Sequence, residues 1–210
     1  MSLRNLKSVE DVRRHYDHEA ATYQVGEGFK FLLGEKRLRR RLFSTARGKI
    51  LDVACGTGEN FPFFSAGSDV TAIELSTAML EQARRRARKL GLQVNLQQMD
   101  AQHLEFAVNS FDTVTSALST CTFPDPIMAL REMGRVCKQD GRILLFEHGL
   151  ARYRWMANYQ HRKAQQQYDN QACRWNQDPF QLVTDAGLTL TNTSRALLGI
   201  YYIIEAAPAK

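Results

Sequence analysis

The sequence has 210 residues, 44% of them hydrophobic and 24% charged, which is typical of a globular protein with one domain or two small ones. These proportions exclude a mainly disordered chain, and no apolar run approaches the roughly 18 residues of a membrane-spanning helix. The formal net charge of +6 leaves nucleic acid, an anionic membrane or an acidic small molecule as candidate partners.

Residues 1–47 are predicted to form an N-terminal helical cap. Their start is polar and lacks the apolar run of a secretory signal peptide, so we expect a cytoplasmic protein. Residues 8–46 follow a helical period, and seven basic residues without an acidic one lie between Lys36 and Lys49. This basic run indicates either a solvated helix face or peripheral contact with an anionic membrane.

From residue 48 onward, short apolar strands alternate with helices. Helices are predicted after the N-cap residue Ser76, as far as Leu90, and from Pro124 to Lys138. The predicted strands span 49–55, 69–73, 94–97, 111–117 and 141–146, with two more near 188–195 and 200–206.

This alternation predicts an α/β fold with a mostly parallel sheet and helices on both faces. In such sheets the ligand lies beyond the carboxyl ends of the strands, where the strand order reverses. The loops at 54–59, 74–76, 100–101 and 117–122 are therefore expected to meet in one crevice.

The first of these loops and the acid after the second strand indicate an adenosine-containing ligand. Gly56 and Gly58 permit a tight turn and close approach of a ligand to the backbone. A helix is predicted to start at this loop and to direct its free N–H groups toward the ligand. Glu74 ends the second strand, where a carboxylate can accept hydrogen bonds from both ribose hydroxyls.

Two residues argue against a dinucleotide. Phe61 occupies the place of the third glycine in the dinucleotide fingerprint, and the carboxylate of Glu59 would repel a phosphate at the helix start. A ligand with ribose but no phosphate fits better. S-adenosylmethionine (SAM) has this composition, and its cationic part is compatible with Asp52 and Glu59.

These residues resemble the class I SAM-dependent methyltransferases of the UbiE-like, methyltransferase type 11 group. The stretch 50–58 is similar to the family's motif I, with Ala54 in place of the usual first glycine. Segments at 74–79, 99–101, 111–117 and 124–146 follow in the family's order, so the resemblance covers roughly 48–150. It implies a Rossmann-like fold with a seven-stranded sheet, and it makes 48–210 a SAM-binding core within a single overall domain.

The resemblance also implies the cofactor site, with S-adenosylhomocysteine as the product. Tyr16 and Tyr23 belong to an N-terminal segment similar to one that folds over SAM in UbiE-like enzymes; the alternative is that they are core aromatics of an amphipathic helix. The residues expected to bind SAM are Asp52, Ala54, Gly56, Gly58, Glu74, Leu75, Met79, Asp100, Ala101, Ala117, Tyr16 and Tyr23.

Residues 150–178 are expected to form an aromatic lid over the acceptor. Both tryptophans, Trp155 and Trp175, lie in this insert, which resembles that of phospholipid N-methyltransferase-like and membrane-associated thiol methyltransferase-like proteins. A small-molecule or lipidic acceptor follows from this resemblance: a quinone precursor, a phospholipid amine or a thiol. His148, after the fifth strand, is the candidate general base, although it could be only a structural partner of Glu147.

The cysteines and histidines have no spacing typical of a metal site. Cys55, Cys121, Cys137 and Cys173 form no paired motif and are too few for a disulfide framework, so we expect reduced thiols and no metal.

Two alternative functions remain open at this stage. The basic runs would suit a nucleic-acid methyltransferase, but no motif for a flipped base follows the fourth strand, so nucleic acid is not expected as the partner. A non-catalytic SAM-binding module that docks on a membrane or a partner is the second alternative.

Overall fold

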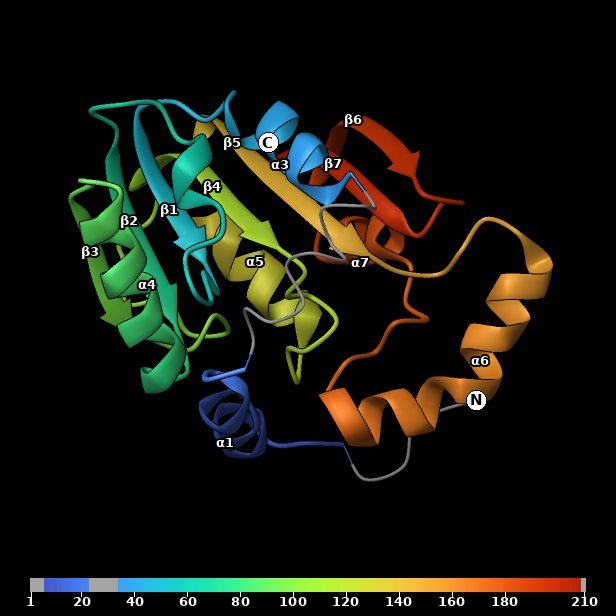
Figure 1. Ribbon diagram of the computed structural model, residues 1–210. Coiled ribbons are helices and arrows are strands. Elements are labelled where there is room, and N and C mark those ends of the chain that lie inside the picture. Colours follow the sequence, from blue (N-terminus) through green and yellow to red (C-terminus); the bar gives the residue numbers. More distant parts are fainter. Residues whose placement is uncertain (1–5, 23–33, 209–210) are drawn as a thin grey trace.

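The computed structural model describes residues 6–22 and 34–208 (Figure 1). The strands are β1 (Lys49–Val53), β2 (Asp69–Glu74), β3 (Val94–Gln98), β4 (Phe111–Ala117), β5 (Cys137–His148), β6 (Thr189–Ala196) and β7 (Tyr201–Ala207). The helices are α1 (Val9–Glu19), α3 (Glu35–Phe43), the 3-10 turn η2 (Phe61–Phe63), α4 (Thr77–Lys89), α5 (Pro126–Val136), α6 (Arg154–Gln171) and α7 (Pro179–Asp185).

All seven strands form one sheet in the order β3-β2-β1-β4-β5-β7-β6. The first five strands in this order are parallel, whereas β7 runs antiparallel to both β5 and β6. The strand order reverses between β1 and β4, so the crevice that binds ligands in such sheets lies at the carboxyl ends of these strands. The predicted seven-stranded, mostly parallel α/β fold is confirmed.

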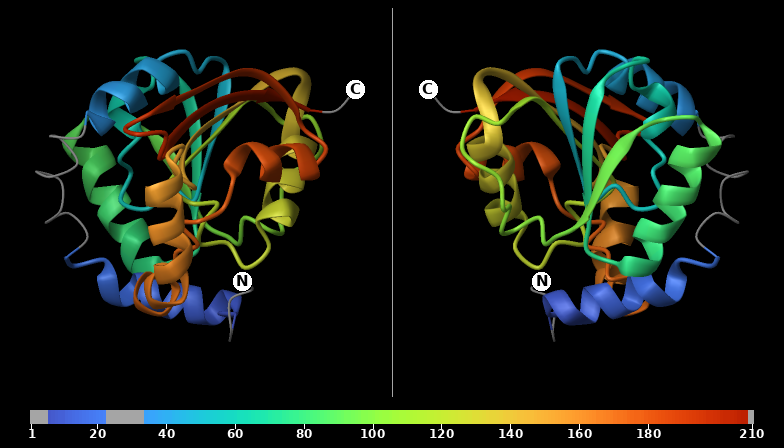
Figure 2. Two further views of the ribbon diagram at one scale, coloured as in Figure 1. Left: turned by 90° about the vertical axis from the view of Figure 1, so that its right-hand side faces the viewer. Right: turned by 90° about the vertical axis from the view of Figure 1, so that its left-hand side faces the viewer.

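Helices cover both faces of the sheet (Figure 2), and an apolar core on each face holds them in place. On one face, Leu130 and Met133 of α5 and Val183 of α7 are fully or almost fully buried. On the other, Phe43 of α3 and Leu80 of α4 pack with strand residues. Strands that are covered on both faces tend to be rich in apolar residues, which is why β1 and the stretch 143–146 of β5 were visible in the sequence.

Local signals explain where several elements begin. The Ser76 hydroxyl accepts a hydrogen bond from the Met79 amide (3.1 Å) and caps α4 as predicted. Asp125 caps α5 in the same way, through the Met128 amide. The strand predicted at 141–146 is longer than expected, because β5 begins at Cys137.

Two expectations about the N-terminal half need correction. After the glycine loop the chain forms only the short turn η2, which ends because the backbone becomes extended at Phe64 (φ −72°, ψ 146°). The helical stretch predicted at 8–46 is described as two separate helices, α1 and α3, and residues 23–33 lie outside the described part.

Helices α1 and α3 occupy different places. Helix α1 lies across the carboxyl ends of the strands (Figure 1). Helix α3 packs on the sheet itself, where Leu42 and Phe43 join the same buried cluster as Ile50 and Phe146. The predicted N-terminal cap, residues 1–47, therefore includes a helix, α3, that packs as part of the core.

Part of the basic run is buried rather than solvated. Arg39 is only 6% exposed, and its guanidinium donates to Glu35 (2.8 Å) and to the Asn60 side chain (2.7 Å). A buried guanidinium requires such partners because desolvation of an unpaired charge is costly. Within the described ranges, no helix is both long enough and apolar enough to cross a bilayer.

Candidate active site

A cleft opens at the carboxyl ends of β1, β2 and β4; its empty space of about 700 Å³ includes the open solvent at its mouth. Four predicted loops meet there, as the strand order requires. The predicted residues that line the cleft are Tyr16, Ala54, Gly56, Glu74, Leu75, Met79, Asp100, Ala101 and Ala117.

The Glu74 carboxylate is fixed at the end of β2. One oxygen accepts a hydrogen bond from the Gly56 amide and the other from the Ser76 amide, both at 2.9 Å. Burial raises the pKa of Glu74, and these backbone hydrogen bonds act in the opposite direction. Each carboxylate oxygen has two lone pairs, so both can accept a further hydrogen bond from a ligand.

The glycine loop has the backbone that the sequence indicated. Gly56 has φ of +55°, and a Cβ at this position would meet nothing within 4 Å, so bare backbone borders open space. Ala54 also has a left-handed conformation, with φ of 51°. Gly58 does not line the cleft described here; a Cβ there would lie 2.5 Å from the Phe61 ring, so this glycine allows close packing.

Asp52 lies fully buried under the loop and outside the residues that line the cleft. Its Oδ1 accepts from the Thr115 hydroxyl (2.7 Å) and from the side-chain Nδ2 of Asn60 (3.0 Å). Its Oδ2 has no hydrogen-bond partner within the described part of the chain. Because a buried polar atom without a partner is costly, Oδ2 fits a site completed by a ligand that donates a hydrogen bond.

The electrostatics of Asp52 depend on its burial. Burial raises the pKa of Asp52 to about 6, although hydrogen bonds from Thr115 and Asn60 and the charge of Arg39 lower it. Glu59, which was expected to repel phosphate, forms an ion pair with Arg39 at 3.5 Å. Because the pKa of Asp52 is raised to about 6, a cation bound nearby would favour the charged form of this carboxylate.

Asp100 borders the cleft, and its side chain already accepts hydrogen bonds from within the protein. Its Oδ1 accepts from the Gln102 amide (2.9 Å), so Asp100 caps the turn that follows β3. Gln102 in turn accepts from the Asp125 amide (2.7 Å). Asp100 therefore both caps this turn and forms part of the cleft wall.

Helix α1 closes the cleft from the side opposite the sheet. Val12, Arg13 and Tyr16 line the cleft from α1. Asp17 accepts hydrogen bonds from the Ser76 hydroxyl (2.6 Å) and the Ala78 amide (3.3 Å), which fastens α1 to the start of α4. The sequence did not indicate Asp17, because its partners lie about 60 residues away.

Replacing Asp17 with alanine is expected to weaken binding of SAM about tenfold. The variant lacks the charge-assisted hydrogen bond between Ser76 and Asp17, which contributes about 1.5 kcal/mol. Helix α1 is then held less firmly at the rim of the cleft. Calorimetry with SAM measures the effect. Glu10→Ala is the matched control, because Glu10 lies on the same helix outside the cleft lining and pairs with the half-buried Arg13 and the exposed Arg14. Equal affinities for both variants would contradict the role of Asp17.

Other predicted residues lie apart from the cleft. His148 does not line it, and its Nε2 lies 3.3 Å from the Cys121 sulfur and 3.4 Å from the Cys173 sulfur. Its predicted role as a general base has no support from this arrangement. No residue of the predicted lid at 150–178 borders the cleft in the described part of the chain. Tyr23 lies outside the described residues.

The loop after β4 contributes residues that the sequence analysis missed. Its backbone is held by the buried Glu147, whose carboxylate accepts from the amides of Ser119 (3.1 Å) and Thr120 (3.3 Å). Burial raises the pKa of Glu147. The loop lines the cleft with Leu118, Ser119, Thr122, Phe123 and Pro124, and the composition of 118–124 alone did not show which of them face inward.

The fold and the cleft define an α/β domain of the class that binds nucleoside cofactors at a strand-order reversal. Residues 51–145 match the family model described as a methyltransferase domain. The chain therefore belongs to the class I methyltransferases, as the motifs indicated, and SAM is the cofactor of that family.

Two curated relatives and one solved structure illustrate this membership. The chain is 37% identical over 103 residues to a phosphatidylethanolamine N-methyltransferase of Cereibacter sphaeroides, covering 48% of this chain and 51% of the relative. It is 30% identical over 147 residues to the ubiquinone/menaquinone biosynthesis C-methyltransferase UbiE of Bdellovibrio bacteriovorus, covering 67% of this chain and 63% of that protein. It spans about half to two thirds of the length of these relatives.

The similarity to the solved structure extends over the whole chain. The [4+2]-cyclase SpnF has a TM-score of 0.72 at 17% identity, covering 100% of this chain and 99% of its own. At this identity the likeness shows the fold alone. Since one fold supports different chemistries, the activity has to be argued from the site.

Proposed function

We propose that this protein transfers a methyl group from SAM to a small or lipidic acceptor. The cleft carries the proposal: it combines a bare glycine backbone at Gly56 with a fixed carboxylate at Glu74, and the unpartnered Asp52 Oδ2 lies buried under the same glycine loop. Glu74 would hold the ribose hydroxyls and Asp52 the cationic amino-acid part. Leu75, Met79, Asp100 and Ala101 would surround the adenine.

The acceptor is proposed to be apolar around its reactive atom. The cleft is lined by Leu118, Phe123 and Pro124 of the loop after β4, and by Val12 of α1. The relatives named above are a phospholipid N-methyltransferase and a quinone C-methyltransferase. Both names point to lipidic acceptors. A phospholipid amine or a quinone precursor therefore suits this apolar lining, and a thiol is the third candidate acceptor.

Catalysis in this proposal depends on positioning. A methyl group bound to a sulfonium already has a good leaving group, so SAM supplies the activated methyl. The residues of this chain orient the cofactor through Glu74, exclude water with α1 and hold the acceptor against the loop after β4. Deprotonation is needed only if the acceptor must lose a proton.

Incubation with methyl-labelled SAM tests the proposal. The panel contains phosphatidylethanolamine vesicles, a demethylated quinol, a small thiol and RNA, and the labelled product is identified by mass spectrometry. We expect label in one of the first three acceptors. SAM binding without transfer to any acceptor would favour the non-catalytic module, and label in RNA would favour the nucleic-acid alternative.

Binding of SAM is expected to weaken as the pH falls below about 6. The folded-state pKa of Asp52 is about 6, so the carboxylate is charged above this pH and attracts a cation. Below it, protonation removes that attraction, and the affinity falls by up to about tenfold per pH unit. Calorimetry at several pH values measures this. Asp52→Asn should bind more weakly at pH 8 and lose the slope near pH 6; identical profiles would contradict the role of Asp52.

We also propose that the insert touches anionic membranes. Tyr153, Trp155 and Tyr159 are 50%, 64% and 48% exposed, and Arg152 and Arg154 beside them are exposed. Exposed amphipathic aromatics next to arginine suit the headgroup region of a membrane.

Trp155→Ala is therefore expected to reduce binding to anionic vesicles roughly tenfold, since burial of such a side chain contributes about 1.5–3 kcal/mol. Co-sedimentation with vesicles measures the bound fraction. Val108→Ala is the control, because Val108 is 60% exposed but lies before β4, away from the insert. Equal losses for both variants would contradict this site.

A further inference from the structure

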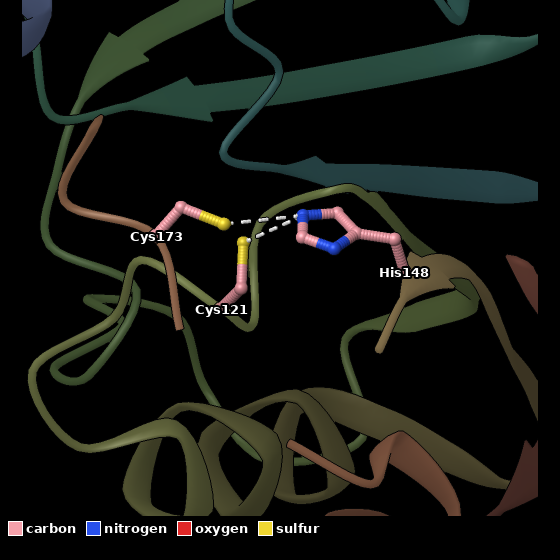
Figure 3. A group of neighbouring side chains, drawn as sticks. All are labelled: Cys121, His148 and Cys173. Atoms are coloured by element: carbon pink, nitrogen blue, oxygen red, sulfur yellow. Dashed lines mark hydrogen bonds between the residues drawn. The ribbon is translucent and has the colours of Figure 1, made fainter. Parts of the chain in front are cut away.

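Three side chains from distant parts of the sequence meet beside the cleft. Cys121 lies in the loop after β4, His148 ends β5, and Cys173 follows α6. Their side chains point toward one another (Figure 3), with the His148 Nε2 at 3.3 Å from Cys121 Sγ and 3.4 Å from Cys173 Sγ. One ligand atom from each residue lies within 4.8 Å of the other two.

These separations match those between ligands of a tetrahedral metal ion. With zinc–sulfur bonds of about 2.3 Å and zinc–nitrogen bonds of about 2.1 Å, tetrahedral geometry places the sulfur and nitrogen atoms roughly 3.6 Å apart. The observed distances from Nε2 to each sulfur, 3.3 and 3.4 Å, are shorter by only a few tenths of an ångström. Small side-chain movements would therefore admit the ion.

We propose that Cys121, His148 and Cys173 bind one thiophilic divalent cation, with zinc as the chemically favoured ion. Two thiolates and an imidazole are soft or borderline ligands that select such metals over magnesium or calcium. Two thiolates, a neutral imidazole and a divalent cation sum to zero charge. This balance suits a site in which Cys121 and Cys173 are 2% and 7% exposed.

The surroundings hold two of the three ligands in place. Glu147 anchors the backbone just before Cys121 through the amides of Ser119 and Thr120. The Arg174 amide donates to the Cys121 carbonyl (2.9 Å), which joins the segments that carry the two cysteines. Ala172, with φ of 52°, ends α6 in a left-handed turn immediately before Cys173. Such support lowers the cost of ordering the ligands when metal binds.

Three protein ligands leave the fourth tetrahedral position to an exchangeable ligand such as water. Closed structural zinc sites have four protein ligands, whereas sites with three keep an open position. The cation would also fasten the loop that carries Cys121 to the segment that carries Cys173. Ser119 and Thr122 of that loop line the cleft, so metal binding would order one of its walls.

Metal titration of the reduced, metal-depleted protein tests the proposal without SAM or acceptor, so its outcome is independent of the proposed methyl transfer. We expect one zinc ion per chain. Cobalt in the same site should give thiolate-to-cobalt charge-transfer absorption and the visible bands of tetrahedral coordination. Cys121→Ser, Cys173→Ser and His148→Gln should each lower the zinc affinity by at least about 100-fold.

Matched variants and a fold check make the result decisive. Cys55→Ser and Cys137→Ser remove buried cysteines outside the cluster, and His103→Gln removes an exposed histidine; all three should keep full zinc affinity. Far-ultraviolet circular dichroism verifies that each variant is folded. If a ligand variant fails to fold, X-ray absorption of the zinc-loaded wild type decides, with two sulfurs and one imidazole nitrogen expected.

Three results would overturn the proposal. One is the absence of stoichiometric zinc binding by the reduced wild-type protein. Another is zinc binding that survives all three ligand substitutions. The last is a Cys121–Cys173 disulfide, seen as a mass two hydrogens lower, that persists under reducing conditions; the cluster would then be a cross-link instead of a metal site.

Discussion

Replacement of Glu74 by glutamine is expected to lower the affinity for SAM by at least about 100-fold. The carboxylate is 8% exposed and already aligned by the Gly56 and Ser76 amides, so both oxygens face a defined direction. Glutamine has the same size but replaces one acceptor oxygen with a donor. Loss of two hydrogen bonds to a charged group corresponds to about 3 kcal/mol or more.

Isothermal titration calorimetry with SAM and S-adenosylhomocysteine measures this effect. Glu81→Gln is the control, because Glu81 is a solvent-facing acid of α4 that pairs with arginines on the same helix. Its affinity should stay within about twofold of the wild type. An affinity of Glu74→Gln close to that of the control would contradict the role given to this carboxylate.

Gly56→Ala is expected to separate ligand binding from folding. Its φ of +55° makes any side chain strained, but the added Cβ would meet no atom of the protein. The strain costs about 1–2 kcal/mol and lowers the melting temperature by about 2–8 °C. The methyl group also fills the space in which a ligand approaches the bare backbone, so we expect SAM affinity to fall at least tenfold, an order-of-magnitude figure for a lost close contact.

Gly67→Ala is the matched control for this prediction. Gly67 has φ of +80°, and a Cβ there would also meet nothing within 4 Å, but it lies before β2 and does not line the cleft. Both variants should lose similar stability in thermal melts, and only Gly56→Ala should lose affinity. If the two variants bind SAM equally well, the ligand does not approach the protein at Gly56.

The sequence allowed the fold to be predicted because its signals are local. The buried strand β1 and the middle of β5 read as short apolar runs, and Ser76 marked the start of α4. The position of the cleft could also be predicted, since the loops that follow parallel strands lie at one edge of the sheet. Glu74 and Gly56 could thus be assigned to one site before their hydrogen bond was known.

Long-range contacts account for what the sequence did not reveal. The basic run around Arg39 suggested a solvated face, but Arg39 is buried because Glu35 and Asn60 neutralise and bind it. Asp17 reaches Ser76 across 59 positions. Cys121, His148 and Cys173 lie about 26 residues apart, so no short ligand motif could indicate their cluster. Periodicity reveals which face of an element is apolar, but not which element it meets.

The insert at 150–178 differs most from its expected position. Its aromatic residues suggested a lid, but the Gln160 side chain binds the Gly149 carbonyl (3.0 Å) and the Ala151 amide (2.8 Å), which fixes α6 against its own connecting loop. The Tyr168 hydroxyl accepts from the Lys7 amide (2.8 Å), so the far end of α6 meets the segment before α1. The insert therefore supports the helix that covers the cleft and leaves Tyr153, Trp155 and Tyr159 exposed.

A crystal structure with S-adenosylhomocysteine bound is the most direct measurement of the cofactor site. We predict that the ribose hydroxyls lie within hydrogen-bonding distance of the Glu74 carboxylate, with the adenine between Leu75 and Ala101 and the amino group near Asp52. Density for the compound outside this cleft, or a ribose turned away from Glu74, would contradict the assignment of the site and the function proposed from it.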